Sequence, residues 1–328
     1  MSEPSPLITL ITRDPADLPA WVIPAAAKAG LNLRVRRCAT PDELLAHAGE
    51  SAILWTVGAN TCLDAEMLPR LPRCRAIMRS GSGLDDLPVR AARARGILVA
   101  NTPEAIAETV AEHTVALILS LVRQIARFDR SVRAGEWRSG PDPGLGHLSG
   151  QTLGLLGFGL IARHTARMLQ GFRPRLIVHD PYAPDAVLRE HGAEAVSFDT
   201  LFREADVLSL HCPLTEETRG IVNAEAFARM KPGALLVNTS RGGVIDEPAL
   251  IAALRGGRLA GAGLDVLDAE PPPPGHPLLA MEQVILSPHL AAFADVFEER
   301  FWRASIQKLG EIATQLSNPT PIKEPHTP

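Results

Sequence analysis

Residues 152–162 read TLGLLGFGLIA, an apolar run that leads directly into the pattern G-x-G-x-x-A at Gly157, Gly159 and Ala162. Gly157 permits a tight turn after a strand, Gly159 lets a pyrophosphate approach the backbone, and Ala162 fits where the following helix meets the strand. The free amide groups at the start of such a helix face the bound anion. The residues predicted to surround the phosphates are Gly157, Phe158, Gly159, Leu160 and Ile161.

Asp180 comes directly after the next apolar stretch, Leu176–His179, where a carboxylate can bind the adenosine ribose of a dinucleotide. Strand, glycines, helix, strand and acid together predict a dinucleotide site, with an ordinary tight turn and a surface carboxylate as the alternative. A carboxylate accepts hydrogen bonds from a 2′-hydroxyl and repels a 2′-phosphate. Because Pro181 and Tyr182 follow, and not an arginine, we expect NAD as the cofactor rather than NADP.

Short apolar runs alternate with helix-compatible stretches on both sides of this motif, which is typical of parallel sheets covered by helices. In the first hundred residues the predicted strands are 7–11, 33–35, 52–57, 76–78 and 97–99, and the predicted helices are 16–29, 41–48, 64–70 and 86–94. A long helix is predicted from 104 to about 134, then an exposed loop from 135 to 150. The second series has predicted strands at 152–156, 176–179, 196–198, 207–211, 235–238, 261–266 and 284–286, and a final helix at 295–316.

Length and composition fit a globular protein of two domains and exclude several other classes. The chain has 328 residues, of which 46% are hydrophobic and 21% charged, and its net charge of −4 gives no electrostatic reason to bind nucleic acid or an anionic membrane. The four cysteines, Cys38, Cys62, Cys74 and Cys212, have no zinc-ligand or disulfide-scaffold spacing, so we expect reduced thiols and no metal. The longest apolar run, 115–122, is too short to span a membrane, and no signal peptide is visible, which favours a cytoplasmic location.

Arg241, Glu270 and His289 are the candidate residues for the reacting end of the site. Arg241 follows a predicted strand, and ligands of open α/β sheets bind at such strand ends, where an arginine can hold a carboxylate with two hydrogen bonds. His289 follows the last predicted strand, and a histidine with an acidic partner can move a proton at neutral pH. From spacing alone, a surface histidine in a loop remains the alternative.

Several further motifs occur in a specific order over about residues 50 to 295. They are RSGSGLD at 79–85, VAEHT at 110–114, GFG at 157–159, HCPLT at 211–215, VNTSRG at 237–242, LDV at 264–266, EP at 270–271 and SPH at 287–289. In this order they resemble the D-isomer-specific 2-hydroxyacid dehydrogenase family. The chain departs from the usual family pattern at Asp85-Asp86-Leu87-Pro88 and at Glu104, near the expected hinge and substrate loop.

The resemblance implies a map of the site. It implies that Arg241 holds the substrate carboxylate with the amide groups of Gly81, Ser82 and Gly83, that His289 protonates the keto oxygen, and that Glu270 supports the imidazolium. It places Asp265 at the nicotinamide end of the cofactor. The further cofactor-binding residues that it implies are His211, Cys212, Pro213, Thr218, Thr239 and Ser240.

The expected fold is α/β with two Rossmann-like lobes: a doubly wound NAD-binding domain, residues 103–294, inserted into a flavodoxin-like substrate domain, residues 1–102 and 295–328. A cleft is expected between the lobes, with closure excluding water. The long helix and the arm to Gly150 resemble the family's dimerisation surface, so a homodimer is expected. No regulatory domain is expected after Leu316, which argues against the longer phosphoglycerate dehydrogenases.

The residues and the resemblance are compatible with three activities. The first is NAD-dependent interconversion of a small 2-keto acid and its D-2-hydroxy acid. The second is an NAD(H)-sensing binding protein, because Gly81-Ser82-Gly83, Asp180-Pro181-Tyr182 and His211-Cys212 resemble the branch that includes the C-terminal binding proteins, which are transcriptional corepressors. The third is oxidation of an oxyanion such as phosphite or formate. The complete Arg241, Glu270 and His289 set favours the first.

Overall fold

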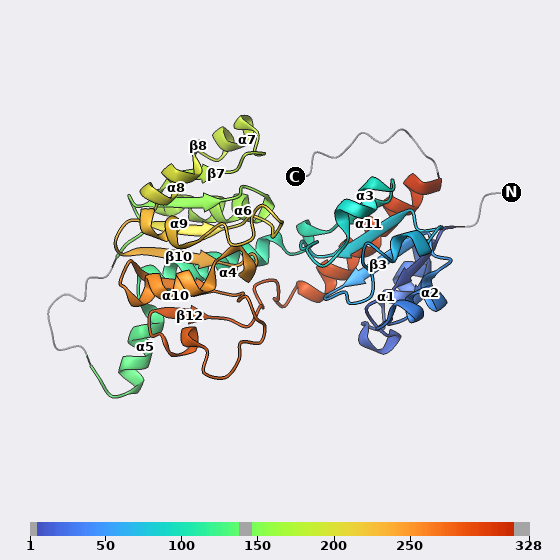
Figure 1. Ribbon diagram of the computed structural model, residues 1–328, viewed down its shortest axis with the longest axis horizontal. Coiled ribbons are helices and arrows are strands. Elements are labelled where there is room, and N and C mark those ends of the chain that lie inside the picture. Colours follow the sequence, from blue (N-terminus) through green and yellow to red (C-terminus); the bar gives the residue numbers. More distant parts are fainter. Residues whose placement is uncertain (1–4, 138–145, 318–328) are drawn as a thin grey trace. The chain divides into compact units, whose positions relative to one another are not determined.

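The structure is a computed structural model and describes residues 5–137 and 146–317. The chain divides into two compact units: unit 1 comprises residues 1–106 and 294–328, and unit 2 comprises residues 107–293. Each unit is built around one sheet in which all the paired strands are parallel (Figure 1). The fold class predicted from the sequence, α/β with two parallel sheets, is confirmed. Part of the predicted arm, 138–145, and the terminal segment 318–328 lie outside the described residues.

Unit 1 has a five-stranded sheet in the order β2-β1-β3-β4-β5, the flavodoxin-like order. Its elements are β1 (Leu7–Leu10), η1 (Pro15–Asp17), α1 (Val22–Lys28), β2 (Asn32–Val35), α2 (Pro41–Ala48), β3 (Ile53–Val57), η2 (Leu68–Arg70), β4 (Ala76–Ser80), α3 (Val89–Ala94), β5 (Leu98–Asn101), η3 (Pro103–Ala105) and α11 (Phe297–Ser317). The C-terminal helix α11 completes this unit, because it buries Trp302 edge-on against Trp55 of β3 and joins Ser305 to Ser80 of β4 by a 2.7 Å hydrogen bond.

Unit 2 has a seven-stranded sheet in the order β12-β11-β10-β9-β6-β7-β8, so the strand order reverses between β6 and β9. Its elements are α4 (Ala107–Val122), α5 (Ile125–Arg133), β6 (Thr152–Leu156), α6 (Leu160–Leu169), η4 (Gln170–Phe172), β7 (Arg175–His179), α7 (Asp185–Glu190), β8 (Ala193–Ala195), α8 (Phe198–Glu204), β9 (Val207–Leu210), α9 (Ala224–Arg229), β10 (Ala234–Asn238), η5 (Gly242–Val244), α10 (Glu247–Arg255), β11 (Leu259–Leu264), η6 (Pro277–Ala280) and β12 (Val284–Leu286). Open α/β sheets bind ligands at the carboxyl ends of the strands beside such a reversal.

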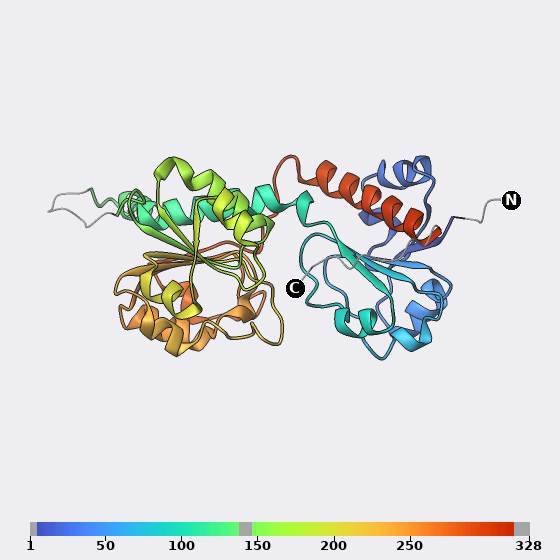
Figure 2. The same cartoon turned by 90° about the horizontal axis from the view of Figure 1, so that it is seen from above.

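Helices cover both faces of the unit 2 sheet, as Figure 2 shows. Helices α4 and α6 pack together on one face, over a core that includes Leu117, Leu121 and Ala162. Helices α8, α9 and α10 cover the other face, over a core that includes Phe202 and Phe227. Because both faces are buried, β6 and β9 consist almost entirely of buried residues, which explains why they appear in the sequence as continuous apolar runs.

Four predicted elements differ from the observed ones. The helix predicted at 16–29 is the 3₁₀ turn η1 followed by the separate helix α1. The long helix predicted from 104 to 134 is a 3₁₀ turn followed by two helices, α4 and α5, which are separated at Gln124, where φ is +53°. The strand predicted at 196–198 lies earlier, at β8, and Ser197 instead caps α8 by accepting a hydrogen bond from the Thr200 amide. Of the helix predicted at 64–70, only the short η2 is present.

Among residues 5–137 and 146–317, no helix is long and apolar enough to cross a membrane.

Candidate active site

The glycine turn after β6 lies at the reversal of the strand order and packs against the end of β9. Gly157 has φ +89°, and a Cβ atom built on it would lie 2.8 Å from the Cys212 nitrogen and 2.9 Å from the His211 carbonyl carbon. Two features therefore require glycine here: the positive φ and the close approach of the backbone that follows β9. The Gly157 amide donates to the His179 carbonyl at 2.9 Å, which ties the turn to the end of β7.

Gly159 meets the opposite condition, because a Cβ atom built on it would contact nothing within 4 Å. It caps helix α6, whose first residues are Leu160 and Ile161. Amide groups in the first turn of a helix have no carbonyl partner within that helix. The open space beside Gly159 and these amide groups fit the pyrophosphate of a dinucleotide, as the sequence motif predicts.

Asp180 lies directly after β7 and folds back onto the glycine turn. Its Oδ2 accepts a hydrogen bond from the Phe158 amide at 2.6 Å, and its Oδ1 accepts one from the Tyr182 amide at 2.8 Å. A carboxylate has about four acceptor sites, so these two bonds leave capacity for ribose hydroxyls. The two amide groups fix the orientation of the carboxylate at the place where the sequence predicts the ribose.

The segment after β9 carries four of the predicted cofactor residues. Burial lowers the pKa of His211 to about 4 and raises the pKa of the Cys212 thiol to about 12, so both side chains are neutral near pH 7. His211 Nε2 lies 2.9 Å from the Ser209 hydroxyl. Thr218 donates its hydroxyl to the Pro213 carbonyl at 2.6 Å and so closes the loop between them.

Arg241 lies at the carboxyl end of β10, in a loop whose backbone is held by a buried asparagine. The Asn238 side chain accepts from the amide and hydroxyl of Ser240 and donates to the Arg241 carbonyl at 2.9 Å. Thr239 is held from the helix side, since its hydroxyl lies 2.8 Å from that of Thr114 in α4. Gly242 packs so closely on Leu267 that any Cβ there would overlap its backbone. The loop is therefore rigid at the position that carries the guanidinium.

His289 and Glu270 are in direct contact, as the sequence predicts for an acid–base pair. His289 Nδ1 donates to Glu270 Oε2 at 2.6 Å, which leaves Nε2 as the nitrogen free for proton exchange. The other oxygen of Glu270 accepts from the Leu267 amide at 3.1 Å. The His289 side chain is 49% exposed, so a substrate can reach it, and its φ of +53° is unusual for a residue with a side chain.

Asp265 shapes the segment that carries His289. Its buried carboxylate accepts hydrogen bonds from the Ser287 hydroxyl at 2.6 Å, from the Leu290 amide at 3.0 Å and from the Ala291 amide at 3.0 Å. Its carbonyl accepts from the His289 amide at 2.8 Å. The structure thus gives Asp265 a role that the sequence does not predict, beside its expected place at the nicotinamide.

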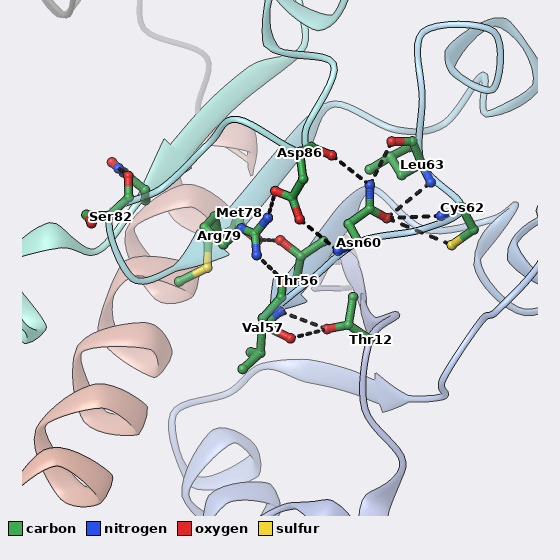
Figure 3. A network of polar contacts seen from close by, with 12 residues as sticks. Thr12, Thr56, Val57, Asn60, Cys62, Leu63, Met78, Arg79, Ser82 and Asp86 are labelled. Carbon is green, nitrogen blue, oxygen red and sulfur yellow. Dashed lines mark hydrogen bonds and ion pairs between the residues drawn. The ribbon is translucent and has the colours of Figure 1, made fainter. Parts of the chain in front are cut away.

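The predicted substrate loop, Gly81-Ser82-Gly83, lies in unit 1 at the carboxyl end of β4. Asn101 donates its side-chain amide to the Ser82 carbonyl at 2.8 Å, and the Gly81 amide donates to Thr102 Oγ1 at 2.9 Å. Figure 3 shows how the two flanks of the loop are joined: Arg79 forms an ion pair with Asp86. The Asp86 carboxylate in turn accepts from the Asn60 amide at 2.7 Å. Asp86, where the chain departs from the usual family pattern, thus supplies a carboxylate that pairs with the buried guanidinium of Arg79.

One histidine near the site has no predicted role. His113 of α4 lies with its Nε2 2.8 Å from the Ser287 hydroxyl, and therefore beside Asp265. The sequence gives two signals for it, a place in the VAEHT motif and a histidine on a predicted apolar helix. Neither signal indicates which segment the helix packs against.

Comparisons with known proteins show what the chain is similar to. Residues 115–291 match the family model described as D-isomer specific 2-hydroxyacid dehydrogenase, NAD binding domain. The chain is 40% identical over 269 residues to glyoxylate reductase of Korarchaeum cryptofilum, covering 80% of this chain and 81% of that protein. It is 40% identical over 276 residues to D-3-phosphoglycerate dehydrogenase of Mycobacterium leprae, covering 84% of this chain but only 52% of that longer relative. D-lactate dehydrogenase of Aquifex aeolicus, solved with NAD and lactic acid, superposes with a TM-score of 0.79 at 28% identity, covering 94% of this chain and 95% of that one.

Proposed function

The chain belongs to the D-isomer-specific 2-hydroxyacid dehydrogenase family, and we propose that it interconverts a small 2-keto acid and its D-2-hydroxy acid with NADH and NAD. The ordered motifs predicted this family, and the match over residues 115–291 confirms it. The observation that carries the proposed activity is the 2.6 Å contact between His289 and Glu270, with Arg241 at a neighbouring strand end of the same sheet.

The cofactor would be held by the elements that the glycine motif brings together. Gly157, Gly159 and the first amide groups of α6 receive the pyrophosphate, and Asp180 receives the ribose. Asp265, Thr239, Ser240 and the 211–218 segment line the way to the nicotinamide, which supplies the hydride when it is bound.

His289 is the proposed proton donor during keto-acid reduction. Its Nδ1 hydrogen is committed to Glu270, so Nε2 carries the proton that is transferred to the keto oxygen. The Glu270 carboxylate fixes the ring orientation and stabilises the imidazolium that this transfer requires. In the oxidation direction the same nitrogen removes the proton from the hydroxyl.

Arg241 is the proposed ligand of the substrate carboxylate. A guanidinium held at a rigid loop offers two parallel hydrogen bonds to a carboxylate, which fixes both the position and the plane of the substrate. Substrate contact by Gly81, Ser82 and Gly83 is part of the same proposal. On this basis unit 1 is the substrate domain, and unit 2 is the cofactor domain.

Initial rates of NADH oxidation with glyoxylate, pyruvate, hydroxypyruvate and larger 2-keto acids test the activity. We expect turnover with at least one of them and none with phosphite or formate. His289→Ala should lower the rate of hydride transfer by about 10²–10⁴-fold while the Kd for NADH changes only a few-fold, because the side chain acts on the keto oxygen and not on the phosphates. NADH binding without turnover of any keto acid would support the sensor function instead.

The proposed assembly is a homodimer formed through α5 and the segment after it. None of the residues of α5 is buried, and Ile125, Val132 and Trp137 expose 55%, 49% and 80% of their surface. Beside the junction of α4 and α5 lies a groove of about 580 Å³ that includes Gln124 and Arg127. Exposed apolar side chains next to a groove are typical of an interface between protein chains.

A further inference from the structure

We propose that His113 is a positioning residue for His289, acting through Ser287 and Asp265. The inference rests on the proposed role of His289 as the proton donor. Helix α4 supplies His113, the loop after β12 supplies Ser287 and His289, and the end of β11 supplies Asp265. All four residues lie in unit 2.

The hydrogen bonds in this group have a defined direction. Ser287 has one hydroxyl hydrogen, and it is donated to Asp265 Oδ1 at 2.6 Å. The 2.8 Å contact between Ser287 Oγ and His113 must therefore be made by a hydrogen on His113 Nε2. His113 thus donates to Ser287, and Ser287 donates to Asp265. Without a donor at position 113, the Ser287 oxygen loses the contact that orients it.

The Asp265 carboxylate is where this chain of hydrogen bonds meets the catalytic segment. Oδ1 accepts from Ser287 and from the Leu290 amide, and Oδ2 accepts from the Ala291 amide. The side chain is 1% exposed, so protein donors must replace the water that a carboxylate would otherwise bind. A rotation of this carboxylate would release the two amide groups directly after His289.

His289 depends on this support because of its backbone conformation. A left-handed φ of +53° is unfavourable for a residue with a side chain, and it persists only where the surroundings enforce it. Three hydrogen bonds enforce this conformation. The His289 amide donates to the Asp265 carbonyl, and the amides of the next two residues donate to the Asp265 carboxylate. If they loosen, the imidazole moves away from the position in which Nδ1 faces Glu270.

We call the hydrogen bonds from His113 to Ser287 and from Ser287 to Asp265 the relay. Helix α4 is a suitable support for this relay. One turn before His113, Thr109 donates its hydroxyl to the Ala292 carbonyl at 3.1 Å, so the helix holds the same segment at a second point. One residue after His113, Thr114 contacts Thr239 in the Arg241 loop. The helix is anchored by buried residues, including Val110, Leu117 and Leu121. The buried helix therefore holds two loops at strand ends. One loop carries the proposed proton donor, His289, and the other carries Arg241, the proposed ligand of the substrate carboxylate.

The first test is a single-turnover measurement of NADH oxidation at saturating cofactor and keto acid. His113→Phe, which cannot donate, should slow hydride transfer by about 10- to 100-fold, since small displacements of catalytic groups have effects of this size. The Kd for NADH should change less than about threefold. His113→Gln, whose side-chain amide can donate to Ser287, should recover most of the rate. His164→Phe is the matched control on α6, outside the relay, and should leave the rate unchanged.

The second test separates positioning from a general loss of structure. In a His289→Ala background, His113→Phe should cause no additional slowing, because its effect passes through His289. An equal loss in both backgrounds, or a His113→Gln rate as low as that of His113→Phe, overturns the proposal. If His113→Phe does not fold, Ser287→Ala takes its place, with Ser287→Thr as the variant that retains the hydroxyl.

Hydrogen exchange gives a readout that does not depend on turnover. The amides of Leu290 and Ala291 should exchange faster in His113→Phe than in the wild-type protein and in His164→Phe, because they are the amides that Asp265 holds. Unchanged exchange at these two amides overturns the relay even if the enzyme is active. Faster exchange in a protein that turns over no keto acid supports the relay and refutes the proposed activity.

Discussion

At the scale of single residues, the choice between NADH and NADPH depends on the carboxylate of Asp180. The Phe158 and Tyr182 amides orient that carboxylate, so a 2′-phosphate in the ribose position would bring like charges together at a fixed place. We expect wild-type kcat/KM to favour NADH strongly. Asp180→Ser should remove much of this preference, chiefly by improving NADPH, with each 1.4 kcal/mol of relieved repulsion worth about tenfold.

The measurement is kcat/KM for both cofactors at one saturating keto-acid concentration. Asp185→Ser, which replaces an acid of the same type at the start of α7, is the control and should not alter the ratio. Equal use of both cofactors by the wild-type protein would mean that Asp180 does not face the ribose.

The lowered pKa of His211 makes the stability of the fold depend on pH. Burial lowers its pKa from the usual 6.5 to about 4, so between these values the unfolded chain binds a proton that the folded chain does not. The contribution of His211 to folding is therefore fully present above about pH 6.5 and is lost as the pH falls toward 4, by up to about 3 kcal/mol. His211→Gln, which can still reach Ser209, should make the free energy of unfolding less dependent on pH in this range.

Urea unfolding of the wild-type protein and of His211→Gln, followed from pH 7 to pH 4, measures this difference. The carboxylates titrate in the same range, but they are common to both proteins and cancel in the comparison. Parallel curves for the two proteins would show that His211 is not buried as a neutral ring.

The sequence predicts the site residues that belong to one local motif. Gly157, Gly159 and Asp180 lie in one strand–turn–helix–strand unit, so their spacing in the sequence fixes their spacing in space. His113 is different, because its partner Ser287 is 174 residues away and lies near it only through the packing of α4 on the sheet. The sequence identifies such a residue as part of a motif but gives no indication of what it contacts.

At the scale of elements, the separation of α4 from α5 is the clearest difference from the sequence-based prediction. The apolar periodicity continues through residues 104–134, and no proline or glycine interrupts it before Gly135. The helix nevertheless breaks at Gln124, whose φ of +53° is not encoded by any turn residue. The strand misplaced at 196–198 has a local cause, because the apolar pair Val196 and Phe198 flanks a serine that caps α8. The helix cap outweighs the apolar pair in this segment.

The break predicts a stabilising substitution. Glycine adopts left-handed φ values without steric cost, so Gln124→Gly should raise the free energy of unfolding by about 0.5–1 kcal/mol after the extra entropy of the unfolded chain is subtracted. Gln124→Ala keeps the strain and loses the 2.8 Å bond from Arg127 to the Gln124 side chain, so it should give no gain. Denaturant titration of the three proteins compares them. If the alanine variant is as stable as the glycine variant, the backbone at position 124 is not strained.

At the scale of the whole molecule, the two sheets could be predicted because each strand of a parallel sheet is followed by a helix, and the alternation is visible in the chain. The C-terminal helix α11 shows how the distant ends of the chain build one unit, since it provides Trp302 and Ser305 to strands near the N-terminus. The sequence analysis already expects residues 295–328 to belong with residues 1–102, and the structure identifies the strand residues that the helix contacts.

We expect two copies of the chain to assemble through the unburied helix α5. Helix α5 has no buried residue, although Arg130 donates to the Glu282 carbonyl at 2.6 Å, and short helices are marginal in water without further support. A second copy of the chain would cover Ile125, Val132 and Trp137 and so stabilise α5. We expect a particle of twice 35.2 kDa by analytical ultracentrifugation. Val132→Glu should shift it toward the monomer by more than about tenfold in dissociation constant, because a carboxylate would be buried without a partner.

Ile23→Glu on α1 of unit 1 is the matched control, since Ile23 is also an exposed apolar residue on a short helix, at 39% exposure. It should leave the sedimentation unchanged. The monomeric variant should also unfold at a lower denaturant concentration than the wild-type protein, by an amount that increases with protein concentration, because association stabilises only the folded chain. A wild-type protein that sediments at 35.2 kDa at micromolar concentration would show that α5 is stabilised within a single chain.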